Sequence, residues 1–204
     1  MKKAIYTILL TAVLVPLTAQ NSGEDYLKNE WNDQRKEILA IKEALSKEDI
    51  SFQISEIPVK NRYLTVKSIE DIVERESGFD PFAVNKKSDA KGLMQITKTA
   101  WKEVNPKTPY ETNWYKPKAN LETGIKYLGW LERAISRNNS RWKHLSRKER
   151  TDQILAAYNW GYQNLKDAKW NLNEAPKETK RYLVFMNHKD KPHPVKHRKH
   201  QKYL

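Results

Sequence analysis

Apolar residues recur at helical spacing along most of the chain, and no alternating run long enough for a central strand stands out. Between residues 24 and 47, lysines and glutamates separate a regular apolar series, which predicts an amphipathic helix. The series consists of Leu27, Trp31, Ile38, Ile41 and Leu45. From 47 to 63 the pattern breaks and Pro58 interrupts it, so we expect a linker or short extended piece before a main domain that begins near residue 62.

Further helices are predicted at short intervals beyond residue 62. Their signals are capping residues before apolar stripes and a glycine or proline at the ends. The first expected helix runs from Thr65 or Ser68 to about Ser77, and helical spacing over 92–104 is followed by a loop over 105–119. Asn120 is expected to cap the next helix. A further helix begins at a Ser146–Glu149 capping box and ends at Gly161, and a weak helix over 162–170 and a last helix from Pro176 follow. The fold class is therefore mostly α.

One glutamate occupies an unusual place in this pattern. Counting back from Glu76 by helical steps gives Val73, Ile72, Ile69 and Val66, so the carboxylate points toward the forming core. Desolvation would favour its neutral form and raise its pKa, which suits a general acid that cleaves a glycosidic bond. The alternative is a helix-end glutamate whose side chain curls out to water.

The first residues have the pattern of a secretory signal peptide. Lys2 and Lys3 precede an apolar stretch over 4–17, and Ala19 offers a cleavage point, so we assign 1–19 to the signal. The stretch is too short and too interrupted for a stable membrane span. The chain has no cysteine, which excludes disulfides, thiolate metal sites and an N-terminal lipid on cysteine. We expect an exported, soluble protein.

The chain carries a net charge of +13, or +11 without Lys2 and Lys3. Exported basic proteins meet anionic surfaces such as wall polymers, lipid headgroups or nucleic acid. The segment 188–204 holds four of the five histidines and six Lys or Arg, so we expect a disordered basic tail. His193, His197 and His200 have metal-ligand spacing, but their composition favours a solvated polycation. We expect no metal and no cofactor.

Several short motifs follow one another in the main domain. They are Glu76-Ser77 with Pro81, Gly92-Leu93-Met94-Gln95-Ile96, Asn120-Leu121 with Gly124, Tyr127 and Leu128, Ala156-Ala157-Tyr158-Asn159-Trp160-Gly161, and Pro176 with Glu178-Thr179 and Tyr182. In this order the motifs resemble the soluble lytic transglycosylase family, whose fold is related to goose-type lysozyme. The resemblance implies a lysozyme-like helical domain with a cleft over 62–187, preceded by a helical extension and linker over 20–61.

The resemblance also implies a reaction on peptidoglycan glycan strands, between N-acetylmuramic acid and N-acetylglucosamine. Glu76 would protonate the bridging oxygen and then, as carboxylate, deprotonate the muramic acid 6-hydroxyl, which closes a 1,6-anhydro ring. A retaining glycosidase needs a second carboxylate roughly 5–5.5 Å away, and the family is expected to do without one. The substrate-binding residues would be Ser77, Asn85, Met94, Gln95, Tyr158, Asn159 and Tyr182.

The chain departs from the family pattern around residue 85. Asn85 replaces an expected serine, and the following loop, 86–91, is about one residue longer, with Asp89 where glycine is usual. We expect Asp80 and Asp89 to cap turns. Among the aromatic residues, Trp114 and Tyr115 lie in a loop and are the better cleft candidates. Trp130 falls near a helix stripe, which favours the core.

These features predict an exported monomeric enzyme whose partner is the peptidoglycan glycan strand, without nucleic acid and without a stable membrane span. Two alternatives stay open: a lysozyme-like hydrolase on the same fold, in which water attacks, and a non-catalytic wall-binding module. The lack of a recognisable nucleic-acid module argues against a nucleic-acid binder.

The basic tail and the 24–47 helix are hypothesised to hold the enzyme at the envelope or at a secretion or conjugation machine, because the charge is unequally distributed. Deletion of 188–204 should then reduce association with sacculi without abolishing turnover of soluble glycan fragments. Co-sedimentation measures this, and unchanged co-sedimentation would contradict the hypothesis.

Overall fold

The computed structural model describes residue 33, residues 35–41 and residues 45–189. The chain divides into two compact units, residues 1–40 and 41–204. In the first unit the described residues, 33 and 35–40, are helical. The expected signal peptide, most of the predicted 24–47 helix and nearly all of the basic tail lie outside the described residues.

The second unit is built from helices and short helical turns. They are α3 (Lys47–Glu56), α4 (Val66–Ser77), α5 (Lys98–Val104), α6 (Pro117–Asn138), η1 (Trp142–His144), α7 (Arg147–Trp160), α8 (Tyr162–Asp167), η2 (Leu172–Glu174) and α9 (Lys177–Lys189). The described ranges contain isolated β-bridges but no strand, which confirms the mostly α fold class. None of the helices in these ranges is long and apolar enough to cross a bilayer.

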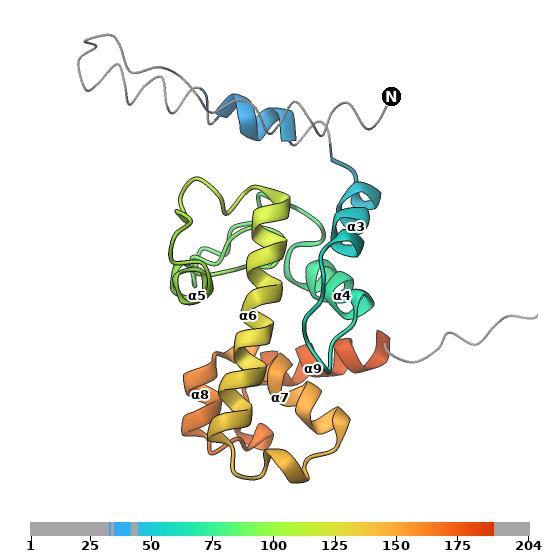
Figure 1. Ribbon diagram of the computed structural model, residues 1–204, viewed down its shortest axis with the longest axis vertical. Helices are drawn as coiled ribbons and strands as arrows, with labels where there is room; N and C mark the ends of the chain where they lie inside the picture. Colours follow the sequence, from blue (N-terminus) through green and yellow to red (C-terminus); the bar gives the residue numbers. More distant parts are fainter. Residues whose placement is uncertain (1–32, 34, 42–44, 190–204) are drawn as a thin grey trace, which may run out of the picture. The chain divides into compact units, whose positions relative to one another are not determined.

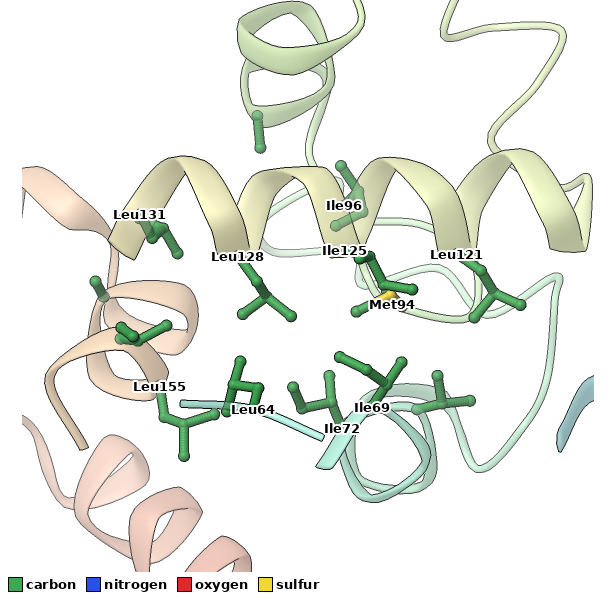
Figure 2. Close-up of a cluster of buried hydrophobic side chains, with 14 of the residues drawn as sticks. Leu64, Ile69, Ile72, Met94, Ile96, Leu121, Ile125, Leu128, Leu131 and Leu155 are labelled. Carbon is green, nitrogen blue, oxygen red and sulfur yellow. The ribbon is translucent and has the colours of Figure 1, made fainter. Parts of the chain in front are cut away.

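The long helix α6 supplies one wall of the core. Figure 1 shows α5 and the long loops beside one end of α6, and α7 and α8 beside the other. Leu121, Leu128 and Leu131 on α6 are almost completely buried. In Figure 2 this face of α6 lies opposite Ile69 and Ile72 of α4, so the two helices enclose the core between them. Burial of each such side chain stabilises the fold by roughly 1.5–3 kcal/mol.

The segment 47–56 is a helix, so the expectation of a linker there is wrong. Ser46 caps α3 through a capping box with Asp49. The pair Ile50 and Ile54, four residues apart, enters the core with exposures of 1% and 0%. Only two buried residues in three turns form too weak an apolar stripe to predict this helix from periodicity. The capping box is a local sequence signal that could have predicted where the helix begins.

The structure differs from two further predictions in the loops around α5. Residues 92–95 form turns, Ile96 pairs with Lys91 in an isolated β-bridge, and the helix begins only at Lys98. The next helix begins at Pro117, with Lys116 at its N-cap position, so Asn120 lies inside α6 and does not cap it. Proline suits a first helical position because its missing N–H needs no partner there. The Asn120 side chain bonds to distant loop atoms instead.

The predicted ends of α4 and α7 and the start of the last helix are confirmed, whereas the helix predicted over 162–170 already ends at Asp167. Thr65 caps α4 in a capping box with Ser68. Ser146 does the same for α7 with Glu149. Gly161 ends α7 at a φ of 102°, a conformation that residues with a Cβ rarely adopt. The last helix starts directly after Pro176.

If α3 is part of the domain core, truncating its buried face must destabilise the whole domain. Ile54→Ala should lower the free energy of unfolding by about 2–5 kcal/mol, because it leaves a cavity at a site with 0% exposure. The matched control is Phe52→Ala on the same helix, where the ring is 59% exposed and the change should stay within about 0.5 kcal/mol. Denaturant unfolding measures both, and equal effects would place α3 outside the cooperative unit.

Candidate active site around Glu76

Helix α4 places Glu76 in its last turn, on the side that faces the core. Ile69, Ile72 and Val73 precede it at helical steps, and all three have 0% exposure. Val66, the first residue of α4, is 38% exposed, so its prediction as a member of the buried stripe is wrong. Gly78 then ends the helix with a φ of 61° and donates its N–H to the Glu74 carbonyl. The stripe therefore continues up to the carboxyl group, which is partly buried.

Burial is the largest influence on this carboxyl and raises the pKa of Glu76 from 4.5 to about 7. The nearby Tyr182 hydroxyl and the positive charge of Arg75 act in the opposite direction, and the negative charge of Glu178 raises the pKa further. About half of the molecules therefore keep the proton at pH 7. A carboxyl in this state can donate a proton and afterwards accept one.

Two phenol groups lie beside the carboxyl. The pKa values of Tyr158 and Tyr182 are raised well above the ordinary value, first by burial and then by the charge of Glu76, so both phenols stay protonated. Tyr158 donates its hydroxyl proton to the Met94 carbonyl at 2.6 Å. Tyr182 Oη is buried and interacts with the Glu76 carboxyl, but within the described residues no partner of full hydrogen-bond geometry meets it.

The loop over residues 83–96 is fastened by two side-chain amides. Gln95 Nε2 donates to the Ala83 and Gly92 carbonyls, both at 3.0 Å. Asn120 reaches over from α6. Its Oδ1 accepts from Met94 N at 2.8 Å, and its Nδ2 donates to backbone carbonyls of the adjoining loops. Because Tyr158 bonds to Met94 as well, Asn120 and Tyr158 hold the same backbone segment from two helices.

A glycine is required where Asn120 crosses this loop. Gly92 has a φ of 80°, and a Cβ there would lie 2.3 Å from Asn120 Nδ2 and 2.5 Å from the Trp114 carbonyl oxygen. The same crowding occurs at Gly124, where a Cβ would lie 2.2 Å from Met94 Sδ. The glycines of two sequence motifs thus permit the close approach of loop and helix.

The predicted substrate-binding residues fall into two groups in the structure. Met94 and Tyr182 have exposures of 0% and 1%, so their side chains act by packing or by contact with Glu76. Ser77, Gln95, Tyr158 and Asn159 keep some exposure. In the second group, Ser77 Oγ donates to the Val73 carbonyl, and Asn159 Oδ1 accepts from the buried Thr179 hydroxyl at 2.8 Å.

The side-chain oxygen of Asn85 is used for hydrogen bonds within its own loop. Its Oδ1 accepts from the backbone N–H groups of Lys87 and Ser88. Its backbone N–H donates to the Ala90 carbonyl, and its carbonyl accepts from the Asp89 N–H, so the backbone closes the turn. The side chain is exposed. The oxygen of the amide thus stabilises the longer loop, and the amide nitrogen is the group left to face outward.

The remaining candidates are placed as follows. Asp80 caps its turn by accepting from Phe82 N at 2.8 Å, which confirms that expectation. Tyr115 is only 2% exposed, so its prediction as a cleft residue is wrong. Trp114 remains partly exposed. Trp130 keeps some exposure and packs at the edge of the core rather than inside it.

Three residues of the sequence motifs, Asn120, Thr179 and Glu178, make contacts at the site that the sequence did not predict. Asn120 and Thr179 are each 1% exposed and bond to site residues. Thr179 lies three residues before Tyr182, so its position on the inward face of the last helix was a usable signal. The effect of Glu178 on Glu76 could not be found from sequence, since it depends on how α9 packs against α4.

Other features of the described residues do not coincide with this site. A hollow of about 580 Å³ is bordered by residues of the 57–60 segment, α5 and α6, including Trp130, but not by Glu76. In the described ranges no three His, Asp or Glu side chains gather closely enough to hold a metal ion. His193, His197 and His200 lie outside these ranges.

The fold and site thus define a helical domain that holds one glutamate of raised pKa beside two protonated phenols. The family model of the transglycosylase SLT domain matches residues 56–182, which is more than half of the chain. The chain belongs to the soluble lytic transglycosylase (SLT) domain family, as its motifs indicated.

A curated relative gives a second comparison. The chain is 35% identical over 96 residues to the membrane-bound lytic murein transglycosylase C of Edwardsiella ictaluri (strain 93-146). The match covers 44% of this chain and 25% of that relative. The chain thus spans about a quarter of the length of the relative that it matches.

The raised pKa makes a specific prediction for stability. The folded protein binds the proton of the Glu76 carboxyl more tightly than the unfolded chain does. The free energy of unfolding therefore decreases as the pH rises from about 4.5 through 7. Glu76→Gln removes this loss, so the variant should gain ~1–3 kcal/mol relative to the wild type between pH 4.5 and pH 8, at about 1.4 kcal/mol per unit of pKa. Denaturant unfolding at both pH values measures the gain.

The matched control is Glu174→Gln, since Glu174 is exposed and lies outside the site. The gain between the two pH values should be larger for Glu76→Gln than for this control. A gain for Glu76→Gln that is no larger than that of the control would show that the residue 76 carboxyl titrates as it does in water.

Proposed function

We propose that this domain is a lytic transglycosylase that cleaves the β-1,4 bond between N-acetylmuramic acid and N-acetylglucosamine in peptidoglycan. Membership of the SLT domain family supports a glycan-cleaving enzyme of this kind. The name of the Edwardsiella relative supports murein as the polymer.

One observation carries the proposal: burial raises the pKa of Glu76 to about 7. The first step of glycosidic cleavage needs a neutral acid that protonates the bridging oxygen. An ordinary glutamate with a pKa of 4.5 is almost fully ionised at neutral pH, whereas Glu76 retains its proton in about half of the molecules. Glu76 therefore serves as the general acid.

The second step uses the carboxylate that the first step leaves behind. Glu76 accepts the proton of the muramic acid 6-hydroxyl, and that oxygen bonds to C1, which closes the 1,6-anhydro ring. The proton lost to the leaving sugar is thus replaced, and no water is consumed. The acetamido group of the substrate helps to stabilise the positive charge at C1.

Neighbouring groups suit this exchange of the proton. Tyr182 stays protonated, and its hydroxyl lowers the pKa of Glu76, which means that it stabilises the carboxylate form. Tyr158 donates its hydroxyl hydrogen to the Met94 carbonyl and lies near the Glu76 carboxyl. Both are positioning residues, because they act through Glu76 and the loop.

The groups that remain for the sugar are few. Thr179 holds the carbonyl oxygen of Asn159, so its amide nitrogen can donate to a sugar acetamido group. Gln95 uses both hydrogens of its amide on the loop, so its carbonyl oxygen is the part that can accept from a sugar hydroxyl. Ser77 and Asn85 stand at the two ends of the turn that follows Glu76 and contribute through their exposed atoms.

A second candidate is hydrolysis at the same site. Glu178 is an exposed carboxylate whose charge reaches Glu76. A hydrolase needs a second carboxylate as nucleophile or to activate water. Glu178 is the residue that would take this role, and then the products would carry reducing ends.

We also propose that the protein is exported, because residues 1–19 carry the charge and apolar pattern of a signal peptide. The enzyme would then meet its polymer outside the cytoplasmic membrane. The domain boundaries of the proposal are 1–19, 20–61, 62–187 and 188–204. Detection of residue 20 as the N-terminus of the exported protein tests the first of them.

Activity on purified sacculi tests the proposed function. Glu76→Gln should lower turnover by about 100-fold or more, since proton transfer by a positioned acid contributes about 10²–10⁴ in rate. Turnover of the wild type should fall as the pH rises through about 7, because the proton-donating form of Glu76 disappears. Release of muropeptides, analysed by mass spectrometry, measures rate and product together.

The control variant Glu174→Gln should digest sacculi like the wild type. Products with 1,6-anhydro ends support the transglycosylase. Reducing ends that disappear in Glu178→Gln would support the hydrolase. Equal digestion by the wild type and Glu76→Gln would contradict the assignment of Glu76 as the acid.

A further inference from the structure

A hollow of about 400 Å³ lies between the starts of α4 and α7 and the last turns of α9. Thr65 and Ser68 of the α4 capping box form one wall, and Arg147 and Lys148, the first two residues of α7, form another. Asn187 of α9 closes a third side, and Figure 1 shows α9 next to both helices. Within the described part of the chain, the residues that border this hollow include no Asp or Glu.

This hollow is separate from the candidate active site. Ser68 lies in the first turn of α4 and Glu76 in the last, so they are roughly 12 Å apart along the helix axis, at about 1.5 Å per residue. None of the residues assigned to the Glu76 carboxyl or to the sugar borders the hollow. A ligand bound there leaves the groups around Glu76 accessible.

The positive charge at the hollow is not balanced by neighbouring carboxylates. Among the described residues, no carboxylate forms an ion pair with the guanidinium of Arg147, which lies 5.7 Å from the centre of the Tyr63 ring. Lys148 pairs with Asp152 at 2.5 Å, but this carboxylate does not border the hollow. The segment 141–150 as a whole contains five Lys or Arg and one Glu. Charge of one sign that is concentrated around a hollow attracts ions of the opposite sign.

The two cations of α7 occupy positions where a helix disfavours them. The first N–H groups of a helix have no partner within the helix and carry partial positive charge, so Lys or Arg in the first turn is unfavourable. In the first turn of α7 the carboxylate of Glu149 accepts from the N–H of Ser146, and α4 has no acidic residue in its first turn. An anion in the hollow would offset the positive ends of both helices and the charge of Arg147 together.

The hydrogen-bond donors at the hollow suit a group with several acceptor oxygens. The Tyr63 hydroxyl accepts from Arg150 at 3.3 Å, so its own hydrogen is available to a ligand. Asn187 Nδ2 donates one hydrogen to Asp152 at 3.2 Å and keeps a second one. Phosphate offers more acceptor oxygens than a carboxylate does, and the planar guanidinium of Arg147 matches its geometry. The volume of about 400 Å³ leaves room for a substituent on the phosphate.

We propose that this hollow is a binding site for a phosphate group, held by the guanidinium of Arg147, the Tyr63 hydroxyl and the starts of α4 and α7. The phosphate belongs either to a soluble phosphate or phosphate ester or to the headgroup of an anionic phospholipid. The site does not depend on the reaction at Glu76. It holds a phosphate-bearing ligand at one end of α4, while Glu76 lies at the other end.

Inorganic phosphate tests the site in the full chain, in a buffer without other multivalent anions. Titration of the ¹⁵N-labelled protein should give saturable shifts of the Lys67, Arg147 and Lys148 amide signals, and the Glu174 amide signal should not move. Arg147→Ala should weaken the affinity about 10- to 100-fold, the effect of losing a hydrogen bond between charged groups. Arg147→Lys keeps the charge but loses the planar pair of donors, so its affinity should lie between the other two.

The matched control is Arg137→Ala, which removes the same charge from an exposed position in the last turn of α6. It should bind phosphate like the wild type. Shifts that do not saturate, or an equal loss of affinity in Arg147→Ala and Arg137→Ala, would show that only the net charge attracts phosphate, and would overturn the site. Both variants should digest sacculi like the wild type. A wild type that binds phosphate but leaves sacculi intact would contradict the proposed function alone.

Sedimentation with vesicles separates the two sources of the phosphate. Mixed phosphatidylglycerol and phosphatidylcholine vesicles provide an anionic surface, and pure phosphatidylcholine vesicles give the background. The basic tail is present in the wild type and in both variants, so it contributes equally to each. A loss of sedimentation in Arg147→Ala alone would identify the headgroup. Equal sedimentation of all three proteins, with binding of inorganic phosphate that depends on Arg147, would identify the soluble source. If all three proteins also bind inorganic phosphate equally, the site does not exist.

Discussion

The desolvation of one carboxyl group governs this domain. Glu76 follows Ile69, Ile72 and Val73, which are fully buried, and α9 packs against the same helix and brings Tyr182 to the carboxyl, so the carboxyl is withdrawn from water. Its pKa rises to about 7 because burial outweighs the opposing influence of Tyr182 and Arg75. The same packing that stabilises the fold therefore raises this pKa, at a cost in stability above neutral pH.

A rigid surrounding is needed to keep such a carboxyl in place, and a small set of polar side chains provides it. Asn120 and Tyr158 both bond to the backbone of Met94, one from α6 and the other from α7. Gln95 closes the same loop on itself. Buried polar groups with satisfied partners fix a single arrangement more sharply than apolar packing does. Among the described residues, the buried Tyr182 hydroxyl meets no partner of full hydrogen-bond geometry, and it interacts with the Glu76 carboxyl.

The domain combines this common centre with elements of its own. Helix α3 precedes most of the region that the family model matches, yet its two isoleucines are part of the core.

The sequence by itself determined the helical class, most helix ends and the inward position of Glu76, because stripes, capping boxes and glycine stops are local signals. It also indicated the family through short motifs. Only the tertiary structure decided that 47–56 is a core helix, that Asn120 bridges a loop instead of capping a helix, and that Tyr115 is buried. The physical reason is that burial, the pKa of Glu76 and the bonds of Asn120 arise from atoms far apart in the chain, which no local pattern contains.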